Sequence, residues 1–219
     1  MNRDEVRRMA AESIASGDAT GWFEDLYRRA GGDWERIPWA DLAPNPYLVE
    51  WLDAQAAPSS GSRCLVVGCG LGDDAEALAA RGWDVVAFDV SATAIEGCRA
   101  RFPASSVQWA VADALAPPAE WRGRFDLVLE SYTLQVLPPE ARAVATAALA
   151  ATVAPGGCLL VLCRAREPHE PEGQLPWPLT RAELDAFRAQ GLDEVSVESF
   201  LDAEDPPVRR FRALYARPG

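Results

Sequence analysis

The chain has 219 residues and a formal net charge of −12, with 49% hydrophobic and 25% charged residues. That length can bury the full hydrophobic core of one domain, and the composition is ordinary for a soluble globular protein. A strongly acidic surface repels phosphate backbones and anionic lipids, so we expect neither a nucleic-acid partner nor a membrane partner. The sequence sets no oligomeric state.

The cysteine and histidine content argues against a metal site. No two cysteines form a C-x-x-C pair and most lie in apolar runs, so we interpret them as reduced cysteines of a cytoplasmic protein. His169 is the one histidine, so no histidine-based metal site is expected. The charged N-terminus lacks the apolar region of a signal peptide. The cysteines are Cys64, Cys69, Cys98, Cys158 and Cys163.

The front of the chain is predicted to be helical over residues 3–16 and 21–30. Residues 33–46 are irregular and rich in tryptophan and proline, and a short helix is expected over 47–52. This aromatic front segment, over residues 21–46, is interpreted as a lid that closes over a site and excludes water.

The remainder of the chain alternates short apolar strands with helices, which predicts a mostly parallel sheet with helices on both faces. The last two strands have no helical pattern between them, so they are expected to form an antiparallel hairpin at the edge of the sheet. Strands are predicted near residues 63–67, 84–88, 106–111, 125–130, 157–163, 193–201 and 208–216, and helices near 73–81, 92–101, 139–152 and 180–189.

Two segments admit other readings. The uncharged run from Ala143 to Cys163 is long enough to raise the question of a membrane span. Pro155-Gly156-Gly157 interrupts that run, which favours a helix, a turn and a buried strand. The basic run from Val208 to Arg212 could mark a surface for anions, but it is better interpreted as an edge strand.

The segment after the first predicted strand is rich in glycine, and an acid ends the second strand. Gly68, Gly70 and Gly72 allow backbone to approach a ligand where a Cβ would clash, although glycine turns also serve ordinary packing. Asp89 can accept both hydroxyl protons of a ribose. A nicotinamide fingerprint has glycine where Asp73 stands, and a carboxylate there would repel a pyrophosphate. We therefore favour a nucleoside cofactor without phosphate.

Acids end three successive strands: Asp89, Asp113 and Glu130. In a doubly wound sheet these positions lie at one edge, where Asp113 can accept a hydrogen bond from an adenine amino group. The set is far more specific than any one of its members.

Here the chain resembles the class I S-adenosylmethionine-dependent methyltransferases, most strongly over about residues 60–165. The run from Gly68 to Gly72 resembles their first motif, and the run from Phe125 to Glu130 resembles their fourth-strand motif. The resemblance implies that Asp89 binds the ribose and Asp113 contacts the adenine. It also implies an α/β fold with a doubly wound, mostly parallel seven-stranded sheet (the Rossmann-like methyltransferase fold), an antiparallel C-terminal strand pair, a helical N-terminal lid and S-adenosylmethionine as the cofactor.

A closer resemblance is to the thiopurine and halide/thiol methyltransferases. Gly21-Trp22 and Pro38-Trp39 resemble the aromatic pattern in their front segment, and Gly72-Asp73-Asp74 resembles a Gly-x-Asp after their first motif. The run from Val136 to Arg142 is similar to their Pro-Pro-Glu-x-Arg motif. It departs from that motif at Ala143-Val144-Ala145, where an aromatic residue is missing.

For the cofactor site, functional and structural readings compete. Asp89 could cap the helix that follows it, and Asp74 could simply begin a helix, where an acid is favoured by the dipole. Trp22 could be a core residue, whereas Trp39 is the best lid candidate. The predicted cofactor-binding residues are Trp22, Trp39, Gly68, Cys69, Gly70, Asp74, Asp89, Val90, Asp113, Ala114 and Glu130.

The predicted catalytic residues are Glu130, Tyr132 and Arg142. Glu130 and Tyr132 could instead form a solvated strand end, and a surface salt bridge is the commoner role for an arginine such as Arg142. No acid–base pair is evident in the sequence, and a thiolate needs orientation more than it needs a base, so a thiol or other soft acceptor is favoured.

We expect residues 1–219 to form a single methyltransferase domain, with 1–55 as the N-terminal lid segment and 56–219 as the Rossmann-like core. The predicted function is methyl transfer from S-adenosylmethionine to a small-molecule substrate. An N- or O-methyltransferase of a specialised metabolite and a non-catalytic module that binds adenosyl ligands are the alternatives.

Overall fold

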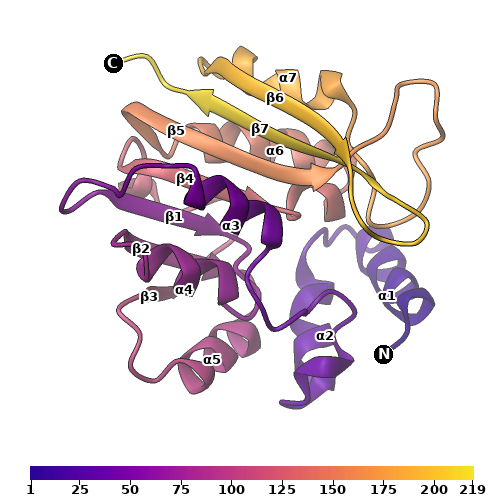
Figure 1. Cartoon of the computed structure of the whole chain (residues 1–219). Helices are drawn as coiled ribbons and strands as arrows, with labels where there is room; N and C mark the ends of the chain where they lie inside the picture. The colour runs from indigo at the N-terminus through magenta and orange to yellow at the C-terminus, as the bar shows by residue number, and fades with distance from the viewer. The chain divides into compact units, whose positions relative to one another are not determined.

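Helices and strands alternate along the chain in the computed structural model, which describes residues 1–219 (Figure 1). Every predicted helix and strand is present, and three short 3-10 helices are added. The helices are α1 (Arg3–Ala15), α2 (Gly21–Ala30), α3 (Pro46–Asp53), α4 (Asp73–Ala79), α5 (Ala92–Arg101), α6 (Pro139–Ala150) and α7 (Arg181–Ala189), and the 3-10 helices are η1 (Trp34–Arg36), η2 (Ala119–Trp121) and η3 (Leu134–Val136). The strands are β1 (Arg63–Val67), β2 (Asp84–Asp89), β3 (Gln108–Val111), β4 (Phe125–Ser131), β5 (Val153–Arg164), β6 (Asp193–Leu201) and β7 (Arg209–Ala216).

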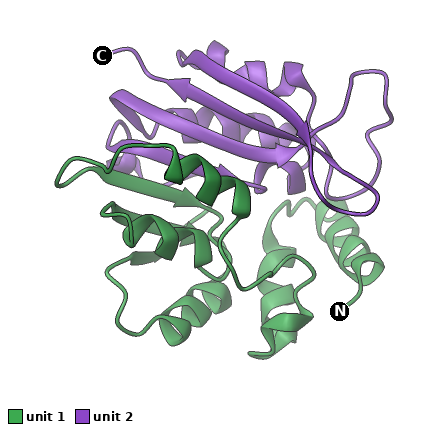
Figure 2. Ribbon diagram, viewed as in Figure 1, with its two compact units in different colours: residues 1–114 green, residues 115–219 purple.

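The sheet has seven strands in the order β3-β2-β1-β4-β5-β7-β6. This order confirms the doubly wound, mostly parallel sheet with an antiparallel C-terminal strand pair. The chain divides into two compact units, residues 1–114 and residues 115–219 (Figure 2). None of the helices combines the length and the apolar character that crossing a membrane requires.

Residues 1–114 contain the three parallel strands β1, β2 and β3 with α1 to α5. β1 pairs in parallel with β2, and β2 pairs in parallel with β3. Most residues of β1 and β2 are buried, among them Leu65, Val66 and Ala87, whereas β3 is partly exposed. The burial of β1 and β2 on both faces is what continuous apolar runs predict for parallel strands.

Residues 115–219 contain β4, β5, β7 and β6 with α6 and α7. β4 and β5 are parallel, while β7 is antiparallel to both β5 and β6. The Tyr215 hydroxyl donates to the Leu184 carbonyl of α7 at 3.0 Å, which fastens that helix to β7. The Tyr215 ring also lies beside Phe187.

Two expectations need correction. The basic run is not the edge strand, because β7 lies between β5 and β6, and β6 is at the edge. Its arginines are accommodated there by carboxylates: Arg210 pairs with Asp202 at 2.7 Å, and Arg212 with Glu198 at 2.6 Å.

The fifth strand begins at Val153, earlier than residue 157, and its register against β4 shifts between Phe125 and Leu127. Gly157 is required at this irregular point, since a Cβ there would lie 2.8 Å from the Phe125 carbonyl oxygen. The residues expected to form a turn are therefore part of an irregular strand beginning.

Candidate functional site

The loop between β1 and α4 needs its glycines. Gly68, Gly70 and Gly72 all have positive φ angles, of 56°, 53° and 91°. A Cβ on Gly72 would lie 2.6 Å from the Trp109 ring, and one on Gly70 would lie 3.2 Å from the Tyr27 hydroxyl oxygen. Backbone angle and space therefore both select glycine here.

Asp89, at the end of β2, is bonded directly to this loop. Its side chain is 6% exposed and accepts hydrogen bonds from the Gly70 N–H at 3.0 Å and from the Ser91 N–H at 2.9 Å. Asp89 is not the cap of α5, because the Ser91 hydroxyl oxygen caps that helix by accepting from the Ala94 N–H at 3.0 Å.

The charge on Asp89 is poorly solvated. Burial raises the pKa of this carboxyl from 3.8 to about 6, and the backbone N–H groups of Ser91 and Gly70 offset only part of that rise. A carboxylate has about four lone-pair sites, and two backbone bonds leave acceptor capacity for hydroxyl donors. Such donors would stabilise the ionised form, so the chemistry fits a ribose.

The segment after β3 lies beside the same acid. Asp89 is paired in register with Val111, and the Ala112 N–H donates to the Asp89 carbonyl at 3.0 Å. Half-buried Asp113 and buried Ala114 follow directly. The structure thus brings the glycine loop, Asp89 and the start of the segment after β3 together within residues 1–114.

Asp73 and Asp74 have structural partners. Asp73 accepts two hydrogen bonds from the Arg101 guanidinium, at 2.7 and 2.8 Å, so its charge is neutralised by α5. The repulsion of a pyrophosphate that we expected from Asp73 is therefore reduced. Asp74 accepts from the Asn45 N–H at 2.7 Å and so ties the start of α4 to the residue before α3.

The front aromatic residues differ sharply in exposure. Trp22 is 1% exposed and stacks on Phe23 with ring centroids 3.8 Å apart. Trp39 is 41% exposed, meets Trp22 edge to face, and its Nε1 donates to the Tyr27 hydroxyl at 3.4 Å. Tyr27 thus links the exposed tryptophan to Gly70. Tyr27 was absent from the predicted site residues.

Glu24 is another residue that sequence reasoning missed. From α2, its carboxylate accepts from the Ser91 hydroxyl at 2.6 Å and from the Thr93 N–H and hydroxyl at 3.1 and 2.8 Å. Burial alone would raise the pKa of Glu24, but these hydrogen bonds lower it overall. The carboxylate lies at the N-terminus of α5, where the dipole favours an anion. The S-x-T pattern of Ser91 and Thr93 at the start of α5 does not indicate a partner as distant in the sequence as Glu24.

In residues 115–219, Glu130 is completely buried in β4. Its Oε1 accepts from the Thr133 and Leu134 N–H groups at 2.7 and 2.8 Å, whereas Oε2 has no hydrogen-bond partner. Burial raises the pKa of Glu130 to about 7, although the two backbone bonds and the charge of Arg142 oppose the rise. The expected alternative of a solvated strand end does not hold for this residue.

Tyr132 follows β4 with a φ of 62°, an angle that non-glycine residues adopt infrequently. The Arg210 guanidinium carbon lies 5.2 Å from the centroid of the half-buried Tyr132 ring, in cation–π geometry. The backbone is held by the Tyr132 N–H, which donates to the Leu162 carbonyl at 2.9 Å. Neighbouring contacts therefore stabilise a strained residue at this strand end.

Arg142 is buried, which corrects the expectation of a surface salt bridge. Its guanidinium donates to the Leu134 and Leu137 carbonyls, each at 3.1 Å, and to the Glu183 carboxylate. These bonds close the chain around η3. Gln135, within η3, accepts from the Arg164 N–H at 2.7 Å and so ties η3 to β5.

Comparison with known proteins finds similarity to methyltransferases. Residues 64–157 match a family model described as a methyltransferase domain. Over 115 residues the chain is 37% identical to the ubiquinone biosynthesis O-methyltransferase of Thiobacillus denitrificans, covering 52% of this chain and 48% of that protein. It is 28% identical over 166 residues to the probable thiol methyltransferase 2 of Arabidopsis thaliana, covering 74% of this chain and 67% of that protein.

The chain spans about half the length of the first of these curated relatives. A solved structure from work on the conversion of a disulfide bond into a thioacetal group during echinomycin biosynthesis has a TM-score of 0.74 at 24% identity. The match covers 91% of both chains and shows a shared fold.

The strand order and this likeness define a Rossmann-like methyltransferase fold. The matching family model shows that residues 64–157 are similar to a methyltransferase domain of the family that binds S-adenosylmethionine.

Proposed function

We propose that the protein transfers a methyl group from S-adenosylmethionine to a small molecule, with a thiol or another soft nucleophile as the acceptor. The observation that carries the proposal is Asp89, a buried carboxylate bonded to Gly70 of a loop whose glycines have positive φ angles. The similarity to a thiol methyltransferase of Arabidopsis thaliana supports the choice of acceptor. In this proposal residues 1–219 act as one methyltransferase domain, with residues 1–55 covering the site.

The cofactor would be held by residues that differ in chemistry. Gly68, Cys69 and Gly70 offer main chain to the amino-acid part, while Asp89 accepts from the ribose hydroxyls. Asp113 accepts from the adenine amino group, and Trp39 shields the ligand from water. Val90, Ala114, Trp22, Asp74 and Glu130 complete the proposed set.

When bound, S-adenosylmethionine supplies an electrophilic methyl group on a positively charged sulfur. The protein must hold the acceptor roughly 3–3.5 Å from that carbon and in line with the departing sulfur. We assign the acceptor to the cluster around Glu130 and Tyr132. Arg142 acts through the η3 backbone, which its hydrogen bonds to Leu134 and Leu137 fix in place.

Three acceptors of nearly the same shape test the preference for sulfur. Thiophenol, phenol and aniline offer sulfur, oxygen and nitrogen on one ring, and mass spectrometry identifies the methylated product. We expect the methyl thioether to form with the highest kcat/KM. Faster methylation of phenol or aniline would contradict the thiol proposal while leaving methyl transfer itself intact.

O-methylation is the alternative that a specific observation favours. Glu130 has a buried carboxyl with a pKa near 7, which suits a proton acceptor, and Oε2 has no partner. A hydroxyl acceptor has a high pKa and benefits from such a base, whereas a thiol with a pKa of about 8.5 is partly ionised already. If Glu130 serves as a base, Glu130→Gln should lower phenol turnover about 10²–10⁴-fold. A soft acceptor predicts a much smaller loss with thiophenol.

A non-catalytic binding module is distinguished by the same assays. If the protein is such a module, calorimetry will show S-adenosylmethionine binding, and no acceptor in a broad panel of thiols, phenols and amines will give a methylated product. Asp89→Ala provides the control, because it should remove binding and turnover together if the site is assigned correctly.

A further inference from the structure

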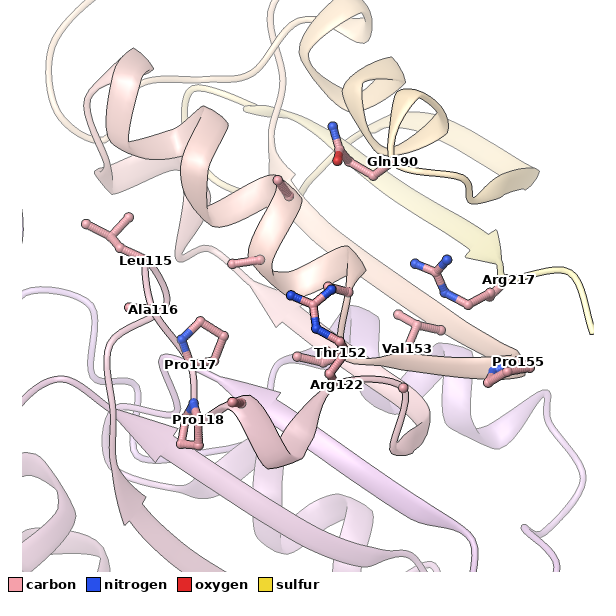
Figure 3. Close-up of a pocket in the computed structure, with 15 residues that line it drawn as sticks. Leu115, Ala116, Pro117, Pro118, Arg122, Thr152, Val153, Pro155, Gln190 and Arg217 are labelled. Atoms are coloured by element: carbon pink, nitrogen blue, oxygen red, sulfur yellow. The ribbon is translucent and has the colours of Figure 1, made fainter.

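A cavity lies within residues 115–219, at the opposite end of β4 from Glu130. Its volume is about 700 Å³, a size that suits a small-molecule ligand. It opens where β4 and β5 begin and where α6 and α7 end (Figure 3). It is lined by Leu115, Ala116, Pro117, Pro118, Ala119, Arg122, Gly123, Ala147, Ala148, Ala151, Thr152, Val153, Pro155, Gln190 and Arg217.

The lining combines small apolar walls with positive charge. Alanine side chains of α6 and the prolines before η2 form the apolar part, and Arg122 and Arg217 are the charged residues. No lining residue is a carboxylate, although acids outnumber lysines and arginines by 33 to 21 in the whole chain. The cavity therefore has a local charge opposite to that of the protein.

One of the arginines has an unsatisfied donor. Arg217 donates from Nη2 to the Ala150 carbonyl at the end of α6, at 2.7 Å, but its Nε is buried without a hydrogen-bond partner. A buried donor left unpaired is unfavourable. In Figure 3, Arg122 and Arg217 lie on either side of Val153, with Gln190 near Arg217.

The helix ends limit the ligand's charge. α6 and α7 both terminate at this cavity, and the C-terminal end of a helix carries partial negative charge. A dianion such as phosphate is disfavoured there, and it would also leave the apolar walls without a partner. A single carboxylate on an apolar body matches both the arginines and the walls.

We propose that this cavity binds a small organic carboxylate with an apolar body, at a site separate from the residues assigned to methyl transfer. The carboxylate accepts hydrogen bonds from Arg217 and Arg122, and the apolar body lies against the alanines of α6.

Octanoate is the probe, with octylamine and inorganic phosphate as comparisons for charge and for the apolar chain. Titration of the full-length protein, followed by NMR or calorimetry, should show saturable octanoate binding with a Kd of roughly 1 mM or tighter. Octylamine and phosphate should bind at least tenfold more weakly. Absence of saturable octanoate binding, or equal binding of phosphate, would overturn the proposal.

Variants locate the site. Arg217→Gln removes the unsatisfied donor, and Ala148→Phe fills the cavity without changing charge; each should weaken octanoate binding at least tenfold. Arg188→Gln removes the same charge from an exposed position of α7 outside the lining and should bind like the wild type. If Arg217→Gln does not fold, Ala148→Phe still decides. If the folded Arg217→Gln and Ala148→Phe variants bind octanoate with wild-type affinity, this cavity is not the binding site.

S-adenosylmethionine affinity is measured in parallel for each variant. It should stay at the wild-type value in Ala148→Phe, because the cavity lies outside the proposed cofactor site. A failure of octanoate binding therefore leaves the proposed function untouched, and a failure of cofactor binding in the wild type leaves the cavity proposal untouched.

Discussion

At the residue scale, Asp89 has two opposed effects on the folded protein. Its carboxylate holds the glycine loop through Gly70, yet burial makes its charge unfavourable until a ligand donates hydrogen bonds. The Asp89 carboxylate is poorly solvated before a ligand binds and gains hydrogen bonds when the ligand binds, which favours the bound state.

Asp89→Ala should weaken S-adenosylmethionine binding without unfolding the protein. Two hydroxyl hydrogen bonds to a carboxylate are lost, each worth about 1.5–3 kcal/mol. Calorimetry of the binding and circular dichroism of the variant check both halves. Unchanged affinity together with lower stability would mean that Asp89 only holds the loop.

The pKa of Asp89 predicts opposite pH trends for stability and binding. The folded-state pKa of Asp89 is near 6, above the usual value of 3.8 for an aspartate, so between these pH values the folded protein binds a proton that the unfolded chain does not. Stability without ligand should therefore rise as the pH falls from 7.5 to 5, by roughly 1.4 kcal/mol for this group. Glu130, with a pKa near 7, acts in the same direction.

Cofactor affinity should fall over the same interval, since the ribose needs ionised Asp89. Below pH 6 the loss approaches about tenfold per pH unit. Denaturant titrations and calorimetry at matched pH values measure the two trends. Parallel trends would contradict a direct contact between Asp89 and the ligand.

Gly72→Ala tests the close packing under the loop, with Gly61→Ala as its control. Both glycines have positive φ angles, of 91° and 82°, but a Cβ meets Trp109 at 2.6 Å only at Gly72, and nothing lies within 4 Å at Gly61. Gly72→Ala should cost about 1–3 kcal/mol more in the free energy of unfolding, because overpacking is added to backbone strain. Equal losses in chemical denaturation would show that Trp109 moves aside freely.

At the scale of elements, the front segment divides into a fixed part and a part that can move. α2 is held by the hydrogen bonds of Glu24 to Ser91 and Thr93 and by buried Trp22. Residues 33–45 contain Trp39, the most exposed of the front tryptophans, and a single 3-10 turn. A lid is therefore best sought in 33–45.

Hydrogen exchange should show this division. We expect α2 to be protected with and without S-adenosylmethionine, and residues 33–45 to gain protection when it binds. Trp39→Ala should reduce that gain and lower turnover, because water reaches the site more easily. Identical protection of 33–45 in both states would make the tryptophan a permanent part of the fold.

The elements themselves were predictable because helix and strand periodicity is a local property. α2, α5, β1 and β6 have the predicted bounds, and all other ends except the start of β5 lie within two residues of the prediction. The central position of β7 was not predictable, since its arginines look like surface residues until Asp202 and Glu198 are seen to pair with them.

In the candidate site, too, local features could be predicted from the sequence and contacts between distant residues could not. Gly68 to Gly72 and Asp89 could be recognised because strand ends and glycine spacing are visible along the chain. Glu24 and Arg101 could not, because their partners are 67 to 69 and 28 residues away and no periodicity connects them. Arg142 looked like a surface residue until Glu183, 41 residues away, was seen to pair with it.

At the scale of the whole molecule, the choice of cofactor depends on Asp73, which stands where the nicotinamide pattern has its last glycine. Arg101 neutralises the charge of Asp73. Charge repulsion at this position is therefore a weaker argument against a pyrophosphate. The remaining argument is steric and chemical: α4 begins with Asp73 and Asp74 instead of the glycine that allows close approach to a diphosphate.

S-adenosylmethionine should therefore stabilise the folded chain, whereas a nicotinamide dinucleotide should not. A ligand present at 100 times its Kd adds about 2.7 kcal/mol to the free energy of unfolding, if it binds only the folded state. For a chain of this size that corresponds to a rise in Tm of roughly 5–10 °C. Asp89→Ala at the same ligand concentration should lose most of the rise, which separates specific binding from a general solvent effect. A nicotinamide dinucleotide that raised the Tm as much, in the absence of any effect of S-adenosylmethionine, would overturn the assignment of the cofactor and with it the proposed reaction.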